Sequence, residues 1–221
     1  MSGATDPFDD LARFQIIPVV EVEHADDAVP LARALSDGGL PVIELTLRTP
    51  AALEAIERVV TQCPDVLVGA GTLLDAQMVA AASAAGARFG VSPGLSRRCL
   101  DAAAEQDLPF VPGVVTPSEA IAALDAGHRH LKFFPAEAYG GVKTLKALAG
   151  PLAATGVRFM PTGGITAANA GGYLALASVF AVGGTWIAPR SEISAGRWPE
   201  IVERARAATQ LVQSLALEAS S

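Results

Sequence analysis

The chain has 221 residues, of which 51% are hydrophobic and only 18% are Asp, Glu, Lys or Arg. This composition predicts a large apolar core, and the length alone permits one domain or two. The formal net charge of −7 argues against nucleic acid as the main partner, because phosphate backbones require basic surfaces. It does not exclude an anionic small substrate, whose phosphate needs only local donors.

The sequence carries no targeting or membrane signal. The acidic segment 1–10 lacks the regions of a signal peptide, and no apolar run approaches the ~18 residues of a membrane span. Cys63 and Cys99 are the only cysteines, and we expect ordinary buried thiols. We therefore expect a cytoplasmic protein without a membrane partner.

Short apolar runs recur at near-regular intervals and predict eight strands, at 16–20, 42–46, 67–71, 89–92, 110–113, 131–134, 158–162 and 179–183. The segments between them predict helices, at 26–38, 50–62, 76–86, 97–106, 117–127, 141–148 and 167–176.

Alternating strands and helices predict an α/β protein, a single (β/α)8 TIM barrel domain over residues 1–221. An N-terminal helix at 7–14 is expected to cover the barrel bottom, and a C-terminal helix at 199–217 to close the domain. An open doubly wound sheet is the competing architecture. The even strand spacing and the lack of a dinucleotide-type glycine motif in the first turn argue against it.

Polar residues fall at the C-terminal ends of the expected strands, where barrel enzymes hold their active sites. Glu44, Thr46 and Arg48 share one face of the second strand if it continues that far, because side chains alternate across a strand. Taken alone, these residues are better explained as a structural ion pair or an exposed edge; polar groups facing inward in an otherwise apolar barrel favour a site instead. Thr72 follows the third strand, and the sequence 92–94 (Ser-Pro-Gly) follows the fourth.

Lys132 lies inside an apolar stretch, where a charge is costly. Most strand lysines extend the ammonium group to water. In a buried pocket, however, the neutral amine could attack a carbonyl group and form a Schiff base. Lys132 shares its strand face with His130 and Phe134.

Two glycine-rich turns, at 161–166 and 182–186, follow the seventh and eighth expected strands. Glycine allows backbone N–H groups to approach an anion, and many barrels bind a phosphate with these two loops. A metal or other cofactor is not expected. The histidines, His24, His128 and His130, form no cluster with ligand spacing, and His130 is interpreted as a packing residue.

The chain resembles the 2-keto-3-deoxy-6-phosphogluconate (KDPG) / 4-hydroxy-2-oxoglutarate aldolases over nearly its whole length, from about Phe14 to about Ala207. The resemblance is carried by six ordered blocks: IPVV at 17–20, IELTLRT at 43–49, VGAGT at 68–72, SPG at 92–94, LKFFPAE at 131–137 and PTGGI at 161–165.

The resemblance implies a class I lyase that cleaves KDPG to pyruvate and glyceraldehyde 3-phosphate. Lys132 matches the Schiff-base lysine of that family, Glu44 its proton-transfer residue, and Arg48 the arginine that binds the pyruvate carboxylate. Cleavage of 4-hydroxy-2-oxoglutarate to pyruvate and glyoxylate is a further implied activity. The family's place in the Entner–Doudoroff pathway of carbohydrate metabolism is implied in the same way.

Further residues are assigned by the same resemblance. The implied substrate-binding positions are Thr72, Pro93, Phe134 and Thr162. The implied phosphate-binding positions are Gly163, Gly164, Gly184 and Thr185. Thr185 departs from the family pattern, in which serine is expected; it keeps a hydroxyl donor and adds a methyl group. The family also implies a homotrimer.

Other functions fit parts of the pattern. A 2-keto-3-deoxy-6-phosphogalactonate aldolase would differ only in the preferred configuration at C4. A metal-dependent pyruvate aldolase would need a ligand cluster, and a barrel isomerase or synthase would not need Lys132. A non-catalytic sugar-phosphate-binding barrel would not need Glu44, Arg48 and Lys132 together.

Overall fold

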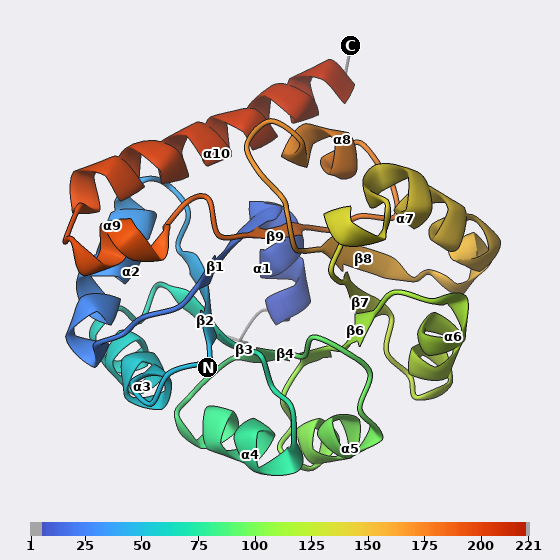
Figure 1. Cartoon of the computed structure of the whole chain (residues 1–221), viewed down its shortest axis with the longest axis horizontal. Coiled ribbons are helices and arrows are strands. Elements are labelled where there is room, and N and C mark those ends of the chain that lie inside the picture. The colour runs from blue at the N-terminus through green and yellow to red at the C-terminus, as the bar shows by residue number, and fades with distance from the viewer. Residues whose placement is uncertain (1–5, 220–221) are drawn as a thin grey trace.

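The strands of the molecule run parallel and are surrounded by helices. Figure 1 shows this arrangement in a computed structural model, which describes residues 6–219. In chain order the strands are β1 (Ile16–Val20), β2 (Val42–Thr46), β3 (Leu67–Gly71), β4 (Phe89–Val91), β5 (Phe110–Val111), β6 (Gly113–Val114), β7 (His130–Phe133), β8 (Arg158–Pro161) and β9 (Val182–Gly184).

The helices alternate with the strands, as the sequence predicts. They are α1 (Pro7–Phe14), α2 (Ala28–Asp37), α3 (Ala52–Gln62), α4 (Ala76–Ala84), α5 (Arg97–Glu105), α6 (Pro117–Asp125), α7 (Gly141–Ala149), α8 (Ala170–Leu174), α9 (Arg190–Ser194) and α10 (Trp198–Ala219). α1 occupies the expected residues, whereas α10 begins and ends slightly outside the range expected for the closing helix. α10 packs against α2, α8 and α9.

The strands form two parallel sheets. One has six strands in the order β5-β4-β3-β2-β1-β9, and the other has three strands in the order β6-β7-β8. An isolated parallel bridge between Thr162 and Gly183 links the end of β8 to β9. The α/β class predicted from the sequence is therefore correct. Because all pairs are parallel, the C-terminal ends of the strands gather at one end of the molecule.

Five of the eight predicted strands have different bounds in the structure. β4 and β8 end one residue earlier than expected, and β7 is shifted one residue towards the N-terminus. The strand expected at 110–113 is divided into β5 and β6 at Pro112, whose nitrogen carries no hydrogen for a sheet ladder. The last strand begins at Val182 instead of Val179. Val179 makes only an isolated bridge with Phe159, whereas Val182 donates its N–H to Gln15 and begins the pairing with β1.

The end of the molecule opposite the strand C-termini is covered by α1, which lies across the middle of the ring in Figure 1. The rings of Phe8 on α1 and His130 at the start of β7 stack with centroids 4.1 Å apart. Phe180 meets the same imidazole edge-on at 5.0 Å. His130 is thus a packing residue, as interpreted from the sequence, and lies at the opposite end of β7 from Phe133.

Within residues 6–219, no group of three His, Cys, Asp or Glu side chains is arranged to hold a metal ion. Over the same residues, none of the helices combines the length and the apolar character needed to cross a bilayer.

Candidate active site

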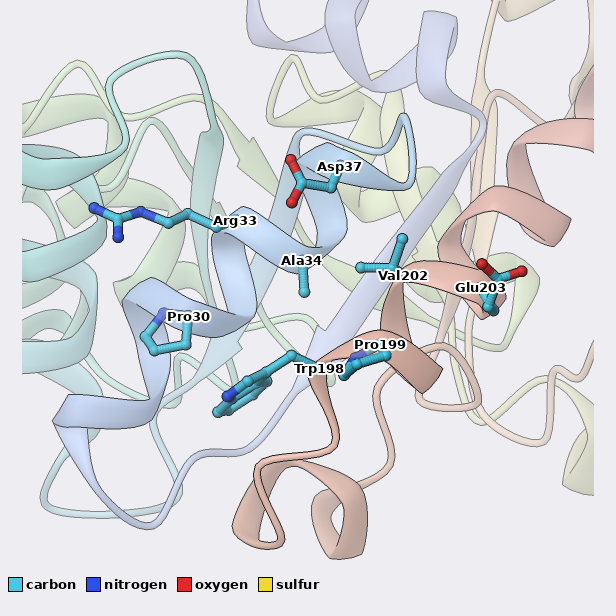
Figure 2. Close-up of a pocket in the computed structure, with 8 residues that line it drawn as sticks. All are labelled: Pro30, Arg33, Ala34, Asp37, Trp198, Pro199, Val202 and Glu203. Carbon is cyan, nitrogen blue, oxygen red and sulfur yellow. The ribbon is translucent and has the colours of Figure 1, made fainter.

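An apolar groove with a volume of about 560 Å³ lies between α2 and α10. Figure 2 shows Trp198, Pro199 and Val202 on one side and Pro30 on the other. Its charged side chains do not converge; Arg33, for example, extends outward. Without converging polar groups, this groove has no chemistry to offer a reacting substrate.

A smaller cavity of about 250 Å³ lies at the C-terminal ends of the strands and is lined by both polar and apolar groups. Its walls come from β1, β2, β7 and β9 and from the loops after β2, β3, β7, β8 and β9. The lining residues are Val19, Glu44, Thr46, Arg48, Thr72, Lys132, Phe134, Thr162, Gly163, Gly164, Ile165, Gly184 and Thr185. We take this cavity as the candidate active site.

A buried lysine–glutamate pair forms the floor of the cavity. Lys132 Nζ lies 3.4 Å from Glu44 Oε1, and the residues are only 5% and 0% exposed. Most strand lysines extend the ammonium group to solvent, but the Lys132 side chain is buried and does not. The other carboxylate oxygen, Glu44 Oε2, is buried and has no hydrogen-bond donor among the described residues. An unsatisfied buried oxygen of this kind is costly, and at a cavity floor it can accept a bond from a bound molecule.

Space for the glutamate side chain is provided by Gly71, which pairs with Thr46 across β2 and β3. A Cβ atom on Gly71 would lie 2.2 Å from Glu44 Oε1 and 2.9 Å from its Cδ and Cγ atoms. Any larger residue would therefore displace the carboxylate. Glycine is required at position 71 because the Glu44 side chain approaches the backbone closely there, and not because the chain turns.

Arg48 follows β2 and lies at the rim of the cavity. Its Nε donates to Thr72 Oγ1 over 3.1 Å, and its Nη1 lies 4.0 Å from Glu21 Oε2. Glu21 is bound more closely by Arg190, with 2.7 Å between Nη1 and Oε1. Because Arg190 already pairs with Glu21, the Arg48 guanidinium keeps its charge available to a bound anion.

Thr72 has an unusual backbone for a β-branched residue, with φ at +60°. This left-handed conformation costs on the order of 1–3 kcal/mol and persists only where surrounding contacts enforce it. The bond from Arg48 Nε to the Thr72 hydroxyl is one such contact. Strained residues of this kind cluster at functional sites, which is consistent with the position of Thr72 in the cavity wall.

A glycine pair forms the wall that follows β8. Gly163 and Gly164 have φ values of +99° and +79°, which side-chain-bearing residues rarely adopt. The ring of Trp186 packs against Gly184 of β9, and a Cβ atom on Gly184 would lie only 1.7 Å from that ring. Trp186 is therefore a packing residue. Both glycine turns lie at the cavity, so their backbones can approach a ligand.

Phe134 and Thr162 line the side of the cavity next to the lysine. Lys132 Nζ lies 5.2 Å from the centroid of the Phe134 ring. Thr162 is buried, and its hydroxyl lies 3.4 Å from the carbonyl oxygen of Met160. An aromatic face beside the amine and a hydroxyl group above the floor give the cavity both apolar and polar contacts for a ligand.

The cavity unites the residues singled out from the sequence with one exception. Pro93 is not among the lining residues; its carbonyl group lies instead beside Gly113. Val19 and Ile165 line the cavity but were not assigned a role. Ile165 directly follows the second glycine of the anion-type loop, which was a usable signal, whereas nothing in the apolar run of β1 distinguishes Val19.

Comparison with known proteins identifies the family of this chain. A model of the family described as "KDPG and KHG aldolase" matches residues 9–204. The KHG/KDPG aldolase of Escherichia coli K12 is 47% identical over 195 residues, which cover 88% of this chain and 91% of that protein.

Solved structures are similar as well. The KDPG aldolase of Legionella pneumophila, with pyruvate captured as a covalent carbinolamine intermediate, is 43% identical with a TM-score of 0.88, covering 92% of this chain and 98% of that one. The aldolase of Zymomonas mobilis ZM4 with 3-phosphoglycerate is 42% identical with a TM-score of 0.84, covering 93% and 96%. The chain belongs to the KDPG and KHG aldolase family.

Proposed function

We propose that this protein is a class I aldolase that cleaves KDPG to pyruvate and glyceraldehyde 3-phosphate through a Schiff base on Lys132. The observation that carries the proposal is the buried pair of Lys132 Nζ and Glu44 Oε1, 3.4 Å apart at the floor of a cavity with anion-binding walls. The covalent pyruvate intermediate of the Legionella pneumophila relative supports the same chemistry.

The reaction begins at the amine. Lys132 Nζ attacks the C2 carbonyl carbon of the substrate and forms a carbinolamine, which loses water to give an iminium ion. A proton can pass between Nζ and Glu44 Oε1 across their 3.4 Å separation, so the carboxylate can assist both steps. The iminium nitrogen then serves as the electron acceptor for cleavage.

Carbon–carbon cleavage follows from proton removal at the C4 hydroxyl group. Glu44, directly or through water, accepts that proton, the C3–C4 bond breaks, and its electron pair moves to the iminium nitrogen. Glyceraldehyde 3-phosphate leaves, and the pyruvate enamine remains on Lys132. Protonation at C3 by Glu44 and hydrolysis release pyruvate and regenerate the amine. Glu44 Oε2, which has no donor among the described residues, is well suited to accept the hydroxyl proton.

The ends of the substrate are bound by opposite walls of the cavity. Arg48, positioned by Thr72, binds the carboxylate and so holds the C2 carbonyl near Lys132. The backbone N–H groups of the loops that contain Gly163 and Gly184 bind the phosphoryl group.

The remaining predicted residues have supporting contacts. Phe134 and Thr162 border the reacting carbons, Gly164 continues the first phosphate loop, and Thr185 adds a hydroxyl donor beside the second. Pro93 is proposed to act only at the cavity margin, since it does not line the cavity.

The second candidate activity is cleavage of 4-hydroxy-2-oxoglutarate to pyruvate and glyoxylate. The Escherichia coli relative is named for both activities. This substrate needs the lysine, the glutamate and the arginine but has no phosphoryl group. It should therefore depend less on the glycine loops than KDPG does.

We also propose that the chain is a single domain whose two sheets close into a (β/α)8 barrel, and that it forms a cytoplasmic homotrimer. The Thr162–Gly183 bridge between β8 and β9 supports closure of the barrel, and the family resemblance supports the trimer. Light scattering in solution should give three times the mass of the chain, and a monomeric mass would refute the trimer.

Borohydride trapping tests the covalent role. The sequence contains three lysines, Lys132, Lys143 and Lys146, and the last two are exposed on α7. Reduction in the presence of pyruvate should add one reduced pyruvate to the wild type and to Lys143→Ala, and none to Lys132→Ala. Peptide mass spectrometry locates the adduct. An adduct that survives in Lys132→Ala would overturn the proposal.

Pyruvate release from KDPG, coupled to lactate dehydrogenase with EDTA present, tests the activity. The wild type should turn over, and Lys132→Ala should lose essentially all activity because the nucleophile is gone. Turnover that requires added metal would contradict the mechanism. Failure of the wild type to release pyruvate would contradict the proposed substrate.

A further inference from the structure

The loop after β8 has its carbonyl groups fixed by donors outside the cavity. The carbonyl oxygen of Thr162 accepts from Ala136 N over 2.8 Å, and that of Gly163 accepts from Glu137 N over 3.1 Å. Both donors belong to the segment that follows the Lys132 strand. The lysine strand and the glycine loop are thus connected by backbone hydrogen bonds.

Glu137 is itself fixed. Tyr173 of α8, fully buried, donates its hydroxyl to Glu137 Oε1, and a Cβ on Gly164 would meet Glu137 Cβ and Cγ at 2.7 Å. Burial, together with the bond to this carboxylate, raises the pKa of Tyr173, so the phenol keeps its proton and remains a donor.

The next carbonyl group of the loop is held by a side chain. Asn169 Nδ2 donates to the Gly164 oxygen over 3.1 Å, and Asn169 Oδ1 accepts from Thr166 N over 2.8 Å. The amide group of Asn169 therefore spans the loop from Gly164 to Thr166. Both of its functional groups are used in this way.

Peptide geometry converts these contacts into an orientation of the loop donors. In a trans peptide the C=O of one residue and the N–H of the next point in opposite directions. Fixing the carbonyl groups of Gly163 and Gly164 therefore directs the N–H groups of Gly164 and Ile165 the other way. Neither N–H donates to a backbone acceptor among residues 6–219, and both residues line the cavity.

We infer that Asn169 is a positioning residue that selects phosphorylated substrates by holding the Gly164–Ile165 peptide with its N–H directed at the phosphoryl group. This inference rests on the proposed function. Loss of the side-chain amide frees the peptide to rotate and removes a donor from the phosphoryl group. The lysine–glutamate pair is untouched, because Asn169 contacts neither residue.

Asn169→Leu tests this role, because leucine has a similar size and no hydrogen-bonding group. The KM for KDPG should rise at least about tenfold, the effect of losing one hydrogen bond to a charged group. The kcat for KDPG, and both parameters for 4-hydroxy-2-oxoglutarate, should change less than about twofold. Inorganic phosphate should inhibit cleavage of 4-hydroxy-2-oxoglutarate by the wild type, and should do so at least about tenfold more weakly in the variant.

Controls separate the inference from folding and from the proposed function. Ala168→Leu, an exposed neighbour, should leave all values unchanged, and Asn169→Ala replaces the leucine variant if that one does not fold. Equal losses for both substrates, or no loss for KDPG, would overturn the role of Asn169. If the wild type cleaves neither substrate, the proposed function fails. Calorimetric titration with inorganic phosphate, which needs no turnover, would then test the loop geometry alone: weaker binding in Asn169→Leu would support it, and unchanged binding would refute it.

Discussion

Gly71→Ala is the sharpest test of how the cavity floor is built. The new Cβ would lie 2.2 Å from Glu44 Oε1 and 2.9 Å from the Cδ and Cγ atoms of that residue. Gly71 does not have a positive φ, so the substitution introduces no backbone strain of its own. Its effect should come entirely from displacement of the glutamate.

The size of that displacement sets the expected effect. An ordinary van der Waals contact of about 3.4–4 Å requires Oε1 to move by roughly 1 Å or more. A misplacement of about 1 Å costs on the order of 10²-fold in rate, and overpacking costs about 1–3 kcal/mol of folding free energy. We therefore expect Gly71→Ala to lower kcat for pyruvate release about 100-fold while the protein remains folded.

Gly150→Ala is the matched control. A Cβ atom on Gly150 would meet nothing within 4 Å, and the φ of this residue is −52°. Both variants are measured by the coupled pyruvate assay and by urea denaturation. Gly71→Ala could instead keep kcat within about twofold of the wild type. In that case either the absence of a Cβ atom at position 71 does not determine where the Glu44 carboxylate lies, or turnover does not depend on that position. The reasoning about the floor would then be wrong.

Three predictions concern stability. Burial lowers the pKa of His130, Arg158 acts in the same direction, and Asp6 and Asp9 oppose it. The folded state therefore binds this proton less readily than the unfolded state, whose pKa is near 6.5, so stability is full above that pH and declines as the pH falls. His130→Phe should flatten this decline in urea titrations between about pH 7 and 5, and an unchanged slope would contradict the assignment. Glu119 belongs to the capping box at the start of α6. Burial by itself would raise the pKa of the Glu119 carboxyl group, but hydrogen bonds from Val115 and Thr116 outweigh burial and lower that pKa. This stabilisation is present above about pH 4.5 and lost as the pH falls through the lower folded value, a loss that Glu119→Gln should not show. Thr116→Ala removes the cap from the Glu119 N–H and should lower the free energy of unfolding by about 1 kcal/mol at pH 7; a change below about 0.3 kcal/mol would refute the role of the cap.

Local sequence patterns determined the strands and the direction of their side chains. The first three strands were predicted with their observed bounds, because each is a short, mainly apolar run and the three recur at a nearly regular spacing. Alternation along β2 and β7 assigned Glu44 and Lys132 to faces on which polar groups are unusual. Where backbone chemistry interrupts a run, as at Pro112, the predicted strand was too long.

Only the tertiary structure decided which of these side chains meet. Glu44 and Lys132 lie 88 residues apart in the chain, and no local pattern encodes their 3.4 Å separation. The bounds of β9 depended on where the chain leaves β8 and joins β1, and the exclusion of Pro93 from the cavity depended on its packing beside Gly113. Side-chain direction along a strand is a local property of the backbone, whereas pairing register and cavity shape depend on contacts between segments that are distant in sequence.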